Sequence, residues 1–92
     1  MFKLFNTTDN TTSYTSEEVK FETRGNRTGV FQANVSSGDS ITLQSRIDNT
    51  FDWADIVTVA DANEIQEVIL APYFRVVVTN TSGNAVVAGL HG

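Results

Sequence analysis

The chain has 92 residues, of which 40% are hydrophobic, and this suffices for one small domain with a single core. Its net charge of −5 argues against non-specific binding to nucleic acid and to anionic membranes. The lack of cysteine excludes disulfides and thiolate metal sites, and no apolar run is long enough for a signal peptide or a membrane span. We therefore expect synthesis in the cytoplasm, no nucleic-acid or membrane partner, and no cofactor.

The first 18 residues differ in composition from the rest of the chain. Residues 1–5 form a short apolar stub, and residues 6–18 are polar and low in complexity. The apolar side chains of the stub are Phe2, Leu4 and Phe5. They form either a first core strand or an apolar plug that inserts into a partner. We predict that residues 1–18 are an arm or an edge strand and that residues 19–92 form the folded domain.

From residue 19 onward, apolar and polar residues alternate with the period of two that is typical of half-buried strands. Turn signals separate these runs every 8–12 residues or so, as in antiparallel sandwiches and small barrels. We predict an all-β fold, a single small antiparallel β-sandwich or barrel of about seven or eight short strands. The residues expected to point inward are Val19, Phe21, Phe31, Ala33, Val35, Ile41, Leu43, Ile47, Trp53, Val57, Val59, Phe74, Val76 and Val78.

Three turns and one ambiguous segment matter for the site. The turn at residues 25–29 carries Arg24 and Arg27, which are either a solvated hairpin end or a small basic contact surface. The turn at residues 36–39 precedes a strand, and residues 81–84 predict a tight hairpin before the last strand. Residues 61–71 fit a helix with a capping box and also a strand, and we favour the strand.

Asp52 and Asp55 flank the only tryptophan, Trp53, and a carboxylate pair beside an aromatic ring is one arrangement found in glycosidases. Residues three apart in a strand point to opposite faces, however, so these carboxylates would not converge. We interpret Asp52 as a turn residue and expect no catalytic site, and the acidic cluster lacks the spacing of a calcium loop. We expect Trp53 to pack in the core, with an exposed sugar platform as the alternative.

Arg75 lies in an otherwise apolar strand, so we expect it to be partly buried and paired with a carboxylate. The candidate partners are Asp52, Asp55 and Glu67.

About 50 residues of the C-terminal half resemble a group of small all-β structural proteins of tailed bacteriophages. The resemblance lies in "ITLQSRI", "WADIVTV", "LAPYFRVVVT" and "AVVAGL". The positions that carry it are Gln44, Arg46, Trp53, Asp55, Pro72 and Arg75. Ser45 departs from the glycine that many of these proteins have there, and residues 1–35 show no match.

The resemblance implies a non-enzymatic virion protein that binds the major capsid protein, or another virion protein, and decorates or cements the capsid. It also implies a homo-oligomer, with a trimer favoured, and a location on the virion. We expect Phe2, Leu4, Phe5, Arg24 and Arg27 to contact partners, and Trp53, Asp55, Pro72 and Arg75 to be structural. The alternative is a carbohydrate-binding appendage of the particle, which would use Trp53 with Tyr14 and Tyr73.

Overall fold

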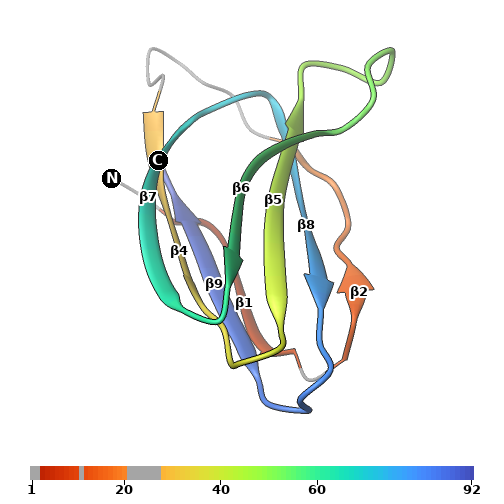
Figure 1. The fold of residues 1–92 in the computed structure, drawn as a ribbon. Helices are drawn as coiled ribbons and strands as arrows, with labels where there is room; N and C mark the ends of the chain where they lie inside the picture. Colours follow the sequence, from red (N-terminus) through yellow and green to blue (C-terminus); the bar gives the residue numbers. More distant parts are fainter. Residues whose placement is uncertain (1–2, 11, 21–27) are drawn as a thin grey trace.

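The computed structural model describes residues 3–10, 12–20 and 28–92 and contains only strands and loops in these ranges. The strands are β1 (Lys3–Asn10), β2 (Tyr14–Thr15), β3 (Val19–Lys20), β4 (Thr28–Asn34), β5 (Ser40–Arg46), β6 (Ala54–Ala60), β7 (Asn63–Ile69), β8 (Tyr73–Thr79) and β9 (Val86–His91) (Figure 1). The all-β prediction is confirmed.

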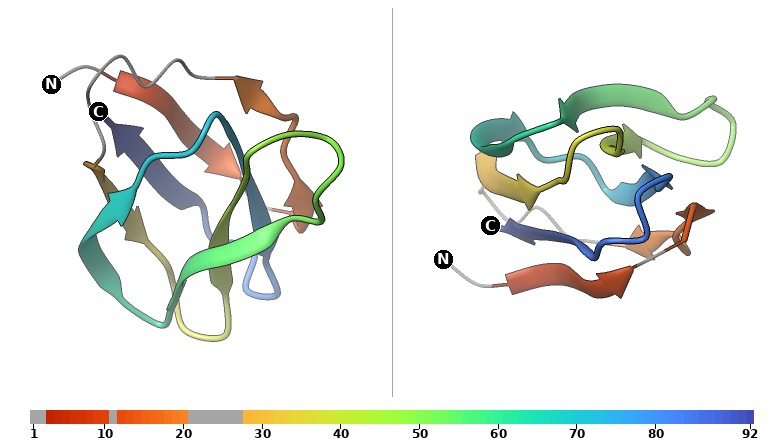
Figure 2. Two further views of the ribbon diagram at one scale, coloured as in Figure 1. Left: turned by 90° about the horizontal axis from the view of Figure 1, so that it is seen from above. Right: turned by 60° about the horizontal axis from the view of Figure 1, so that its bottom comes forward.

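Two antiparallel sheets face each other as two layers (Figure 2). One has the order β1-β9-β4-β7, and the other has the order β2-β8-β5-β6, with β3 also paired to β8. The strand pairs β1–β9, β2–β8, β4–β7 and β5–β6 are nested, so the chain pairs as one long hairpin rolled into two layers. This is the strand order of a jelly roll, the sandwich type found in viral capsid and lectin domains.

The core lies between the layers and is built from the inward residues of alternating strands. Its largest fully buried side chains include Phe31, Phe74, Ile41, Leu43 and Leu90. The prediction is confirmed for all the inward positions of β4 and β8 and for the first two of β5. Ile47 does not point inward, because β5 ends at Arg46, and the side chain of Ile47 is 57% exposed in the loop that follows. Phe21 lies outside the described residues, so its predicted inward position stays a prediction.

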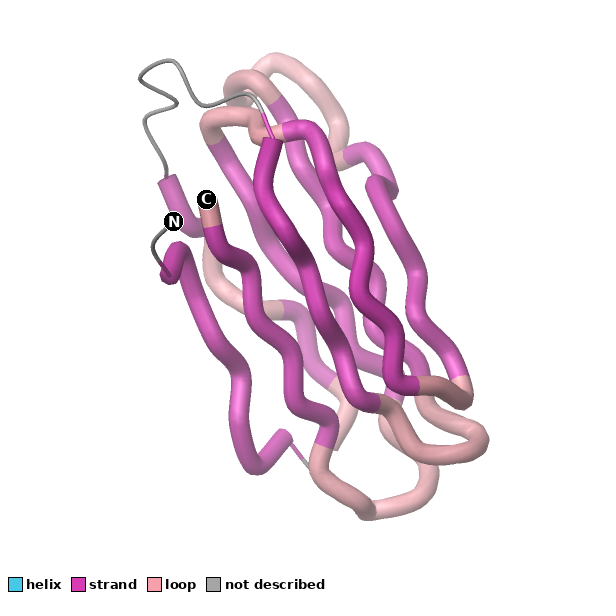
Figure 3. Tube along the Cα trace, turned by 90° about the vertical axis from the view of Figure 1, so that its left-hand side faces the viewer, coloured by secondary structure: helices cyan, strands magenta, loops and turns pink. Residues whose placement is uncertain are grey.

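The N-terminal segment is paired into the sandwich along most of its described length. β1 is the edge strand next to β9, and the pairing of Lys3 with His91 brings both ends of the chain to one end of the four-stranded sheet (Figure 3). Leu4 and Phe5 belong to this strand. Phe2, Arg24 and Arg27 lie outside the described residues, so their predicted partner contacts stay predictions.

Residues 63–69 form strand β7, which agrees with the strand interpretation of the ambiguous segment. Asp61, the residue of the alternative capping box, instead lies at the turn between β6 and β7 with φ 55°. In this left-handed conformation its carboxylate accepts a hydrogen bond from the Gly38 backbone N–H at 2.6 Å. Asp61 therefore ties two neighbouring loops together.

The hairpin predicted at residues 81–84 is wrong, because β8 and β9 belong to different sheets and do not pair. The loop is held by Asp39, which is only 2% exposed. The Asp39 carboxylate accepts hydrogen bonds from the backbone N–H groups of Thr81 (2.8 Å) and Ser82 (3.0 Å) and from the Ser82 hydroxyl (2.6 Å). These bonds, the Ser82 hydroxyl first, lower the pKa of Asp39 against the opposing effect of burial.

Candidate functional site

A bulge in β6 decides where Trp53 lies. Leu43 pairs with Val57, but the next residue of β5, Gln44, pairs with Asp55, so Ile56 is an extra residue in β6. An extra residue reverses the faces on which the residues before it lie. Asp55 therefore shares the outer face with Gln44, and Trp53, two residues earlier, turns outward as well.

The prediction that Trp53 packs in the core is wrong for this reason. Trp53 is half-buried and does not belong to the core. Two arginines of the same outer face contact its ring: the guanidinium carbon of Arg46 lies 4.3 Å from the ring centroid, and that of Arg75 lies 4.6 Å away. Each contact is a cation–π interaction within the usual range of distance.

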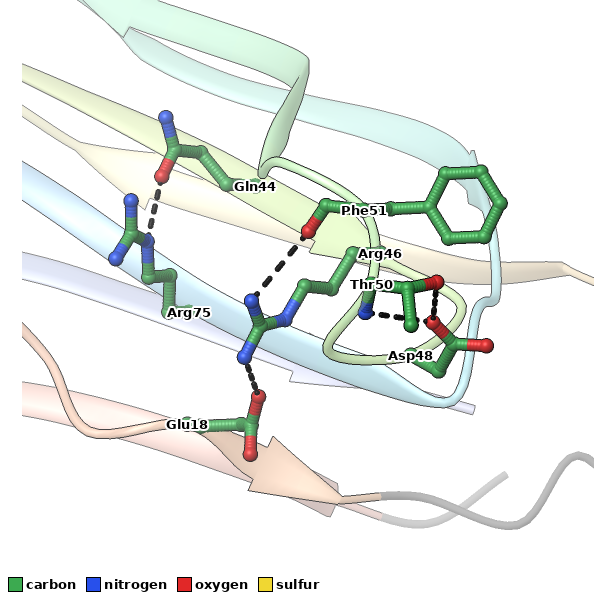
Figure 4. Close-up of polar contacts among 7 residues, drawn as sticks. All are labelled: Glu18, Gln44, Arg46, Asp48, Thr50, Phe51 and Arg75. Atoms are coloured by element: carbon green, nitrogen blue, oxygen red, sulfur yellow. Dashed lines mark hydrogen bonds and ion pairs between the residues drawn. The ribbon is translucent and has the colours of Figure 1, made fainter.

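Gln44 occupies the place that was predicted for an ion pair. Its side-chain amide donates to Asp55 Oδ1 at 2.8 Å. Its Oε1 accepts from Arg75 Nε at 2.7 Å (Figure 4). Within the described ranges, Arg75 has no salt bridge to Asp52, Asp55 or Glu67. The predicted ion pair of Arg75 is thus replaced by a neutral link, and its charge lacks a carboxylate partner among these residues.

Arg46 is held differently. Its Nη2 donates to Glu18 Oε1 at 2.7 Å, and its Nη1 donates to the Phe51 carbonyl at 3.4 Å (Figure 4). Its Nε is buried and has no hydrogen-bond partner among the described residues, so the Glu18 bond and stacking on Trp53 together position the guanidinium. Arg46 therefore joins the segment before β3, the β5–β6 loop and the tryptophan ring.

The loop at residues 47–53 is ordered by its own polar groups. Asp48 Oδ1 accepts from the Thr50 hydroxyl at 2.6 Å and from the Thr50 backbone N–H at 2.8 Å, which is an Asx-type turn. These bonds, the hydroxyl first, lower the pKa of Asp48, and the charge of Arg46 adds to the effect. The turn holds Ile47 and Phe51 in solvent, where they are 57% and 51% exposed.

The carboxylates near Trp53 do not form a catalytic pair. Asp52 lies in the loop, whereas Asp55 lies on β6 and is bonded to Gln44. The described residues contain no group of three or more His, Asp or Glu side chains placed to hold a metal ion. In the same ranges, no helix is long and apolar enough to cross a membrane. The outer face instead offers charged and aromatic side chains that can contact another molecule.

The structure separates the residues that the sequence grouped. Trp53, Asp55 and Arg75 meet on the outer face of the five-stranded sheet, but Pro72 is half-buried in the connection between β7 and β8. The sequence reasoning did not single out Glu18 or Phe51. The short distance of Phe51 from the tryptophan in the sequence, within a polar turn, was the signal that could have found it.

Comparisons of the chain with protein-family models, with curated proteins and with solved structures gave no match. The resemblance to phage structural proteins, and the capsid partner, virion location and trimer that it implies, therefore stay predictions.

Proposed function

We propose that this chain is a non-enzymatic structural protein of a tailed-phage particle that binds the capsid surface and decorates or stabilises it. The resemblance of the C-terminal half is one support. The jelly-roll strand order is compatible with it, since viral capsid proteins are among those that use this sandwich type. A protein that binds only the assembled shell stabilises that shell by mass action.

The observation that carries the proposal is the ordered loop that displays Ile47 and Phe51. Their exposed apolar surface is held by the turn at Asp48 and by the bond from Arg46 to the Phe51 carbonyl. Protein contact sites are enriched in aromatic residues and arginine, and this loop brings the two together, since Arg46 is bonded to the Phe51 carbonyl. The loop thus offers a preorganised contact surface for a capsid protein.

Co-sedimentation of the purified protein with capsids of the phage that encodes it tests this proposal. Replacing both Ile47 and Phe51 by serine removes the apolar surface of the loop, and we expect capsid affinity to fall about tenfold or more, as for truncated interface anchors. The matched control replaces Ile65 and Ile69 by serine as well. These residues are 63% and 73% exposed on the other sheet, and the control should bind as the wild type does.

Absence of wild-type binding to both immature and expanded capsids would reject the proposal. Loss of binding in the Ile65 and Ile69 control alone would move the contact surface to the other sheet. Deleting residues 1–5 is a less direct test, because Lys3 and Phe5 are paired with β9 and their loss perturbs the sheet.

A second candidate function, binding of host glycans, is favoured by the outward position of Trp53. Tyr73 lies on the same outer face, since it pairs with Arg46, whereas Tyr14 packs against the core. The two guanidinium groups on the Trp53 ring compete with a sugar for its surface. Titration of tryptophan fluorescence with a panel of glycans distinguishes the candidates, because capsid contact through the loop predicts no change.

A further inference from the structure

We propose that Arg75 is a binding site for a carboxylate, supplied by an acidic side chain of a partner protein. The site goes beyond the capsid-binding proposal, because it would bind an acidic segment whether or not that segment belongs to a capsid.

The guanidinium of Arg75 is fixed in place before any ligand arrives. Its Nε donates to Gln44 Oε1 at 2.7 Å, Gln44 is in turn bonded to Asp55, and the Trp53 ring centroid lies 4.6 Å from the guanidinium carbon. The side chain is half-buried, so most of its rotamer freedom is already lost in the folded protein. A ligand that binds to it therefore meets a preorganised group.

The terminal nitrogens of Arg75 remain available. Among the residues that the structure describes, no hydrogen bond or ion pair reaches Nη1 or Nη2, and neither atom is buried without a partner. Both nitrogens thus retain contact with solvent. A guanidinium held through Nε presents these two donors side by side, the geometry that matches the two oxygens of a carboxylate.

The surroundings of Arg75 favour an anion. Lys20 and Arg46 both pair with Tyr73, one from each side, so Lys20, Arg46 and Arg75 share this outer face with the Asp55 carboxylate. Arg46 is already neutralised by Glu18, which leaves Arg75 as the fixed cation without a counter-ion in the described ranges.

The same features favour a protein carboxylate over other anions. The net charge of −5 opposes a polyanion such as nucleic acid, whose affinity depends on many neutralised phosphates. Arg46 is bonded to the carbonyl of the exposed Phe51, and Arg46 and Arg75 both lie on the Trp53 ring. Aromatic residues and arginine are enriched in protein interfaces. An acidic residue of a protein partner, with its single charge, suits this setting better than a polyanion does.

The test is a titration of the purified protein followed by NMR, with the side-chain N–H of Arg75 Nε and the indole N–H of Trp53 as reporters. The probes are a short capped peptide with one aspartate between alanines, its asparagine counterpart, galacturonate as an acidic sugar, and sodium chloride at matched ionic strength. We expect saturable shifts with the aspartate peptide and an affinity at least about tenfold above that for the asparagine peptide.

Two variants separate the paired donors from simple charge. Arg75→Lys keeps the charge but loses the pair of parallel donors, and we expect about tenfold weaker binding, seen in the indole resonance. Lys20→Gln removes a cation of the same face that is not part of the site, and the affinity should stay within about twofold, as for exposed charges in salt.

Equal affinities for the aspartate and asparagine peptides, or unchanged affinity in Arg75→Lys, would overturn the proposal. A response to galacturonate without a response to the aspartate peptide would overturn it in favour of a glycan site. If Arg75→Lys does not fold, the wild-type comparison of the two peptides still decides, because it needs no variant.

Discussion

The contact between Trp53 and Arg75 can be measured by a double-mutant cycle. The variants are Trp53→Leu, Arg75→Gln and the double variant, and the measured quantity is the free energy of unfolding in urea followed by circular dichroism. Cation–π contacts at partly exposed sites contribute about 0.5–1 kcal/mol each. We therefore expect a coupling energy of about 0.5–1 kcal/mol between the two positions, which a cycle can resolve.

The total loss in a further variant, Trp53→Ala, distinguishes the outer face from the core. Two cation–π contacts sum to about 1–2 kcal/mol, whereas truncation of a core tryptophan to alanine typically costs about 3–5 kcal/mol. Wild-type Trp53 should also be accessible to acrylamide, because it is half-buried on the sheet surface. A coupling energy of zero together with emission that acrylamide does not quench would refute the outward position of the ring.

Three further predictions concern loops and strand contacts. Gly29→Ala should lower the free energy of unfolding by about 1–3 kcal/mol, because its Cβ would lie 2.5 Å from the His91 carbonyl oxygen; urea unfolding checks this. Asp39→Asn should destabilise the fold at neutral pH, and the difference from wild type should shrink as pH falls below 3.8 through the lowered pKa of Asp39, which thermal melts across pH would show. Asp61→Ala should cost about 1–2 kcal/mol in urea because of its positive φ and its lost hydrogen bond, whereas Asp61→Asn should cost less.

Much of the fold follows from the sequence, because alternation of apolar and polar residues is a local property. The inward sets of β4 and β8 were predicted residue by residue, since each strand is regular over its whole length. The nested pairing of the strands was not predicted. It depends on which distant strands meet, and the residues at 81–84 fit a tight turn equally well whether they join two paired strands or, as here, two layers.

The candidate site was missed for a single physical reason. A regular strand would place Trp53, Asp55 and Val57 on one face, and the apolar character of Trp53 and Val57 favoured the core. The extra residue at Ile56 breaks that relation, so Val57 points inward while Trp53 and Asp55 point outward. Residues before a bulge and residues after it each alternate between the two faces as in a regular strand, so the alternation does not reveal the extra residue. β6 also carries no glycine that would indicate a bulge.

The position of Arg75 is not explained by stability alone. Its cation–π contact and its hydrogen bond to Gln44 together contribute about 1–2 kcal/mol, and the cost of holding a half-buried charge without a described counter-ion opposes that gain. An apolar side chain of similar volume would pack on the same face at little or no loss, as replacements of buried ionic groups often do. A fixed guanidinium with two open donors is therefore better understood as a group held ready for an acidic partner than as a support of the sheet.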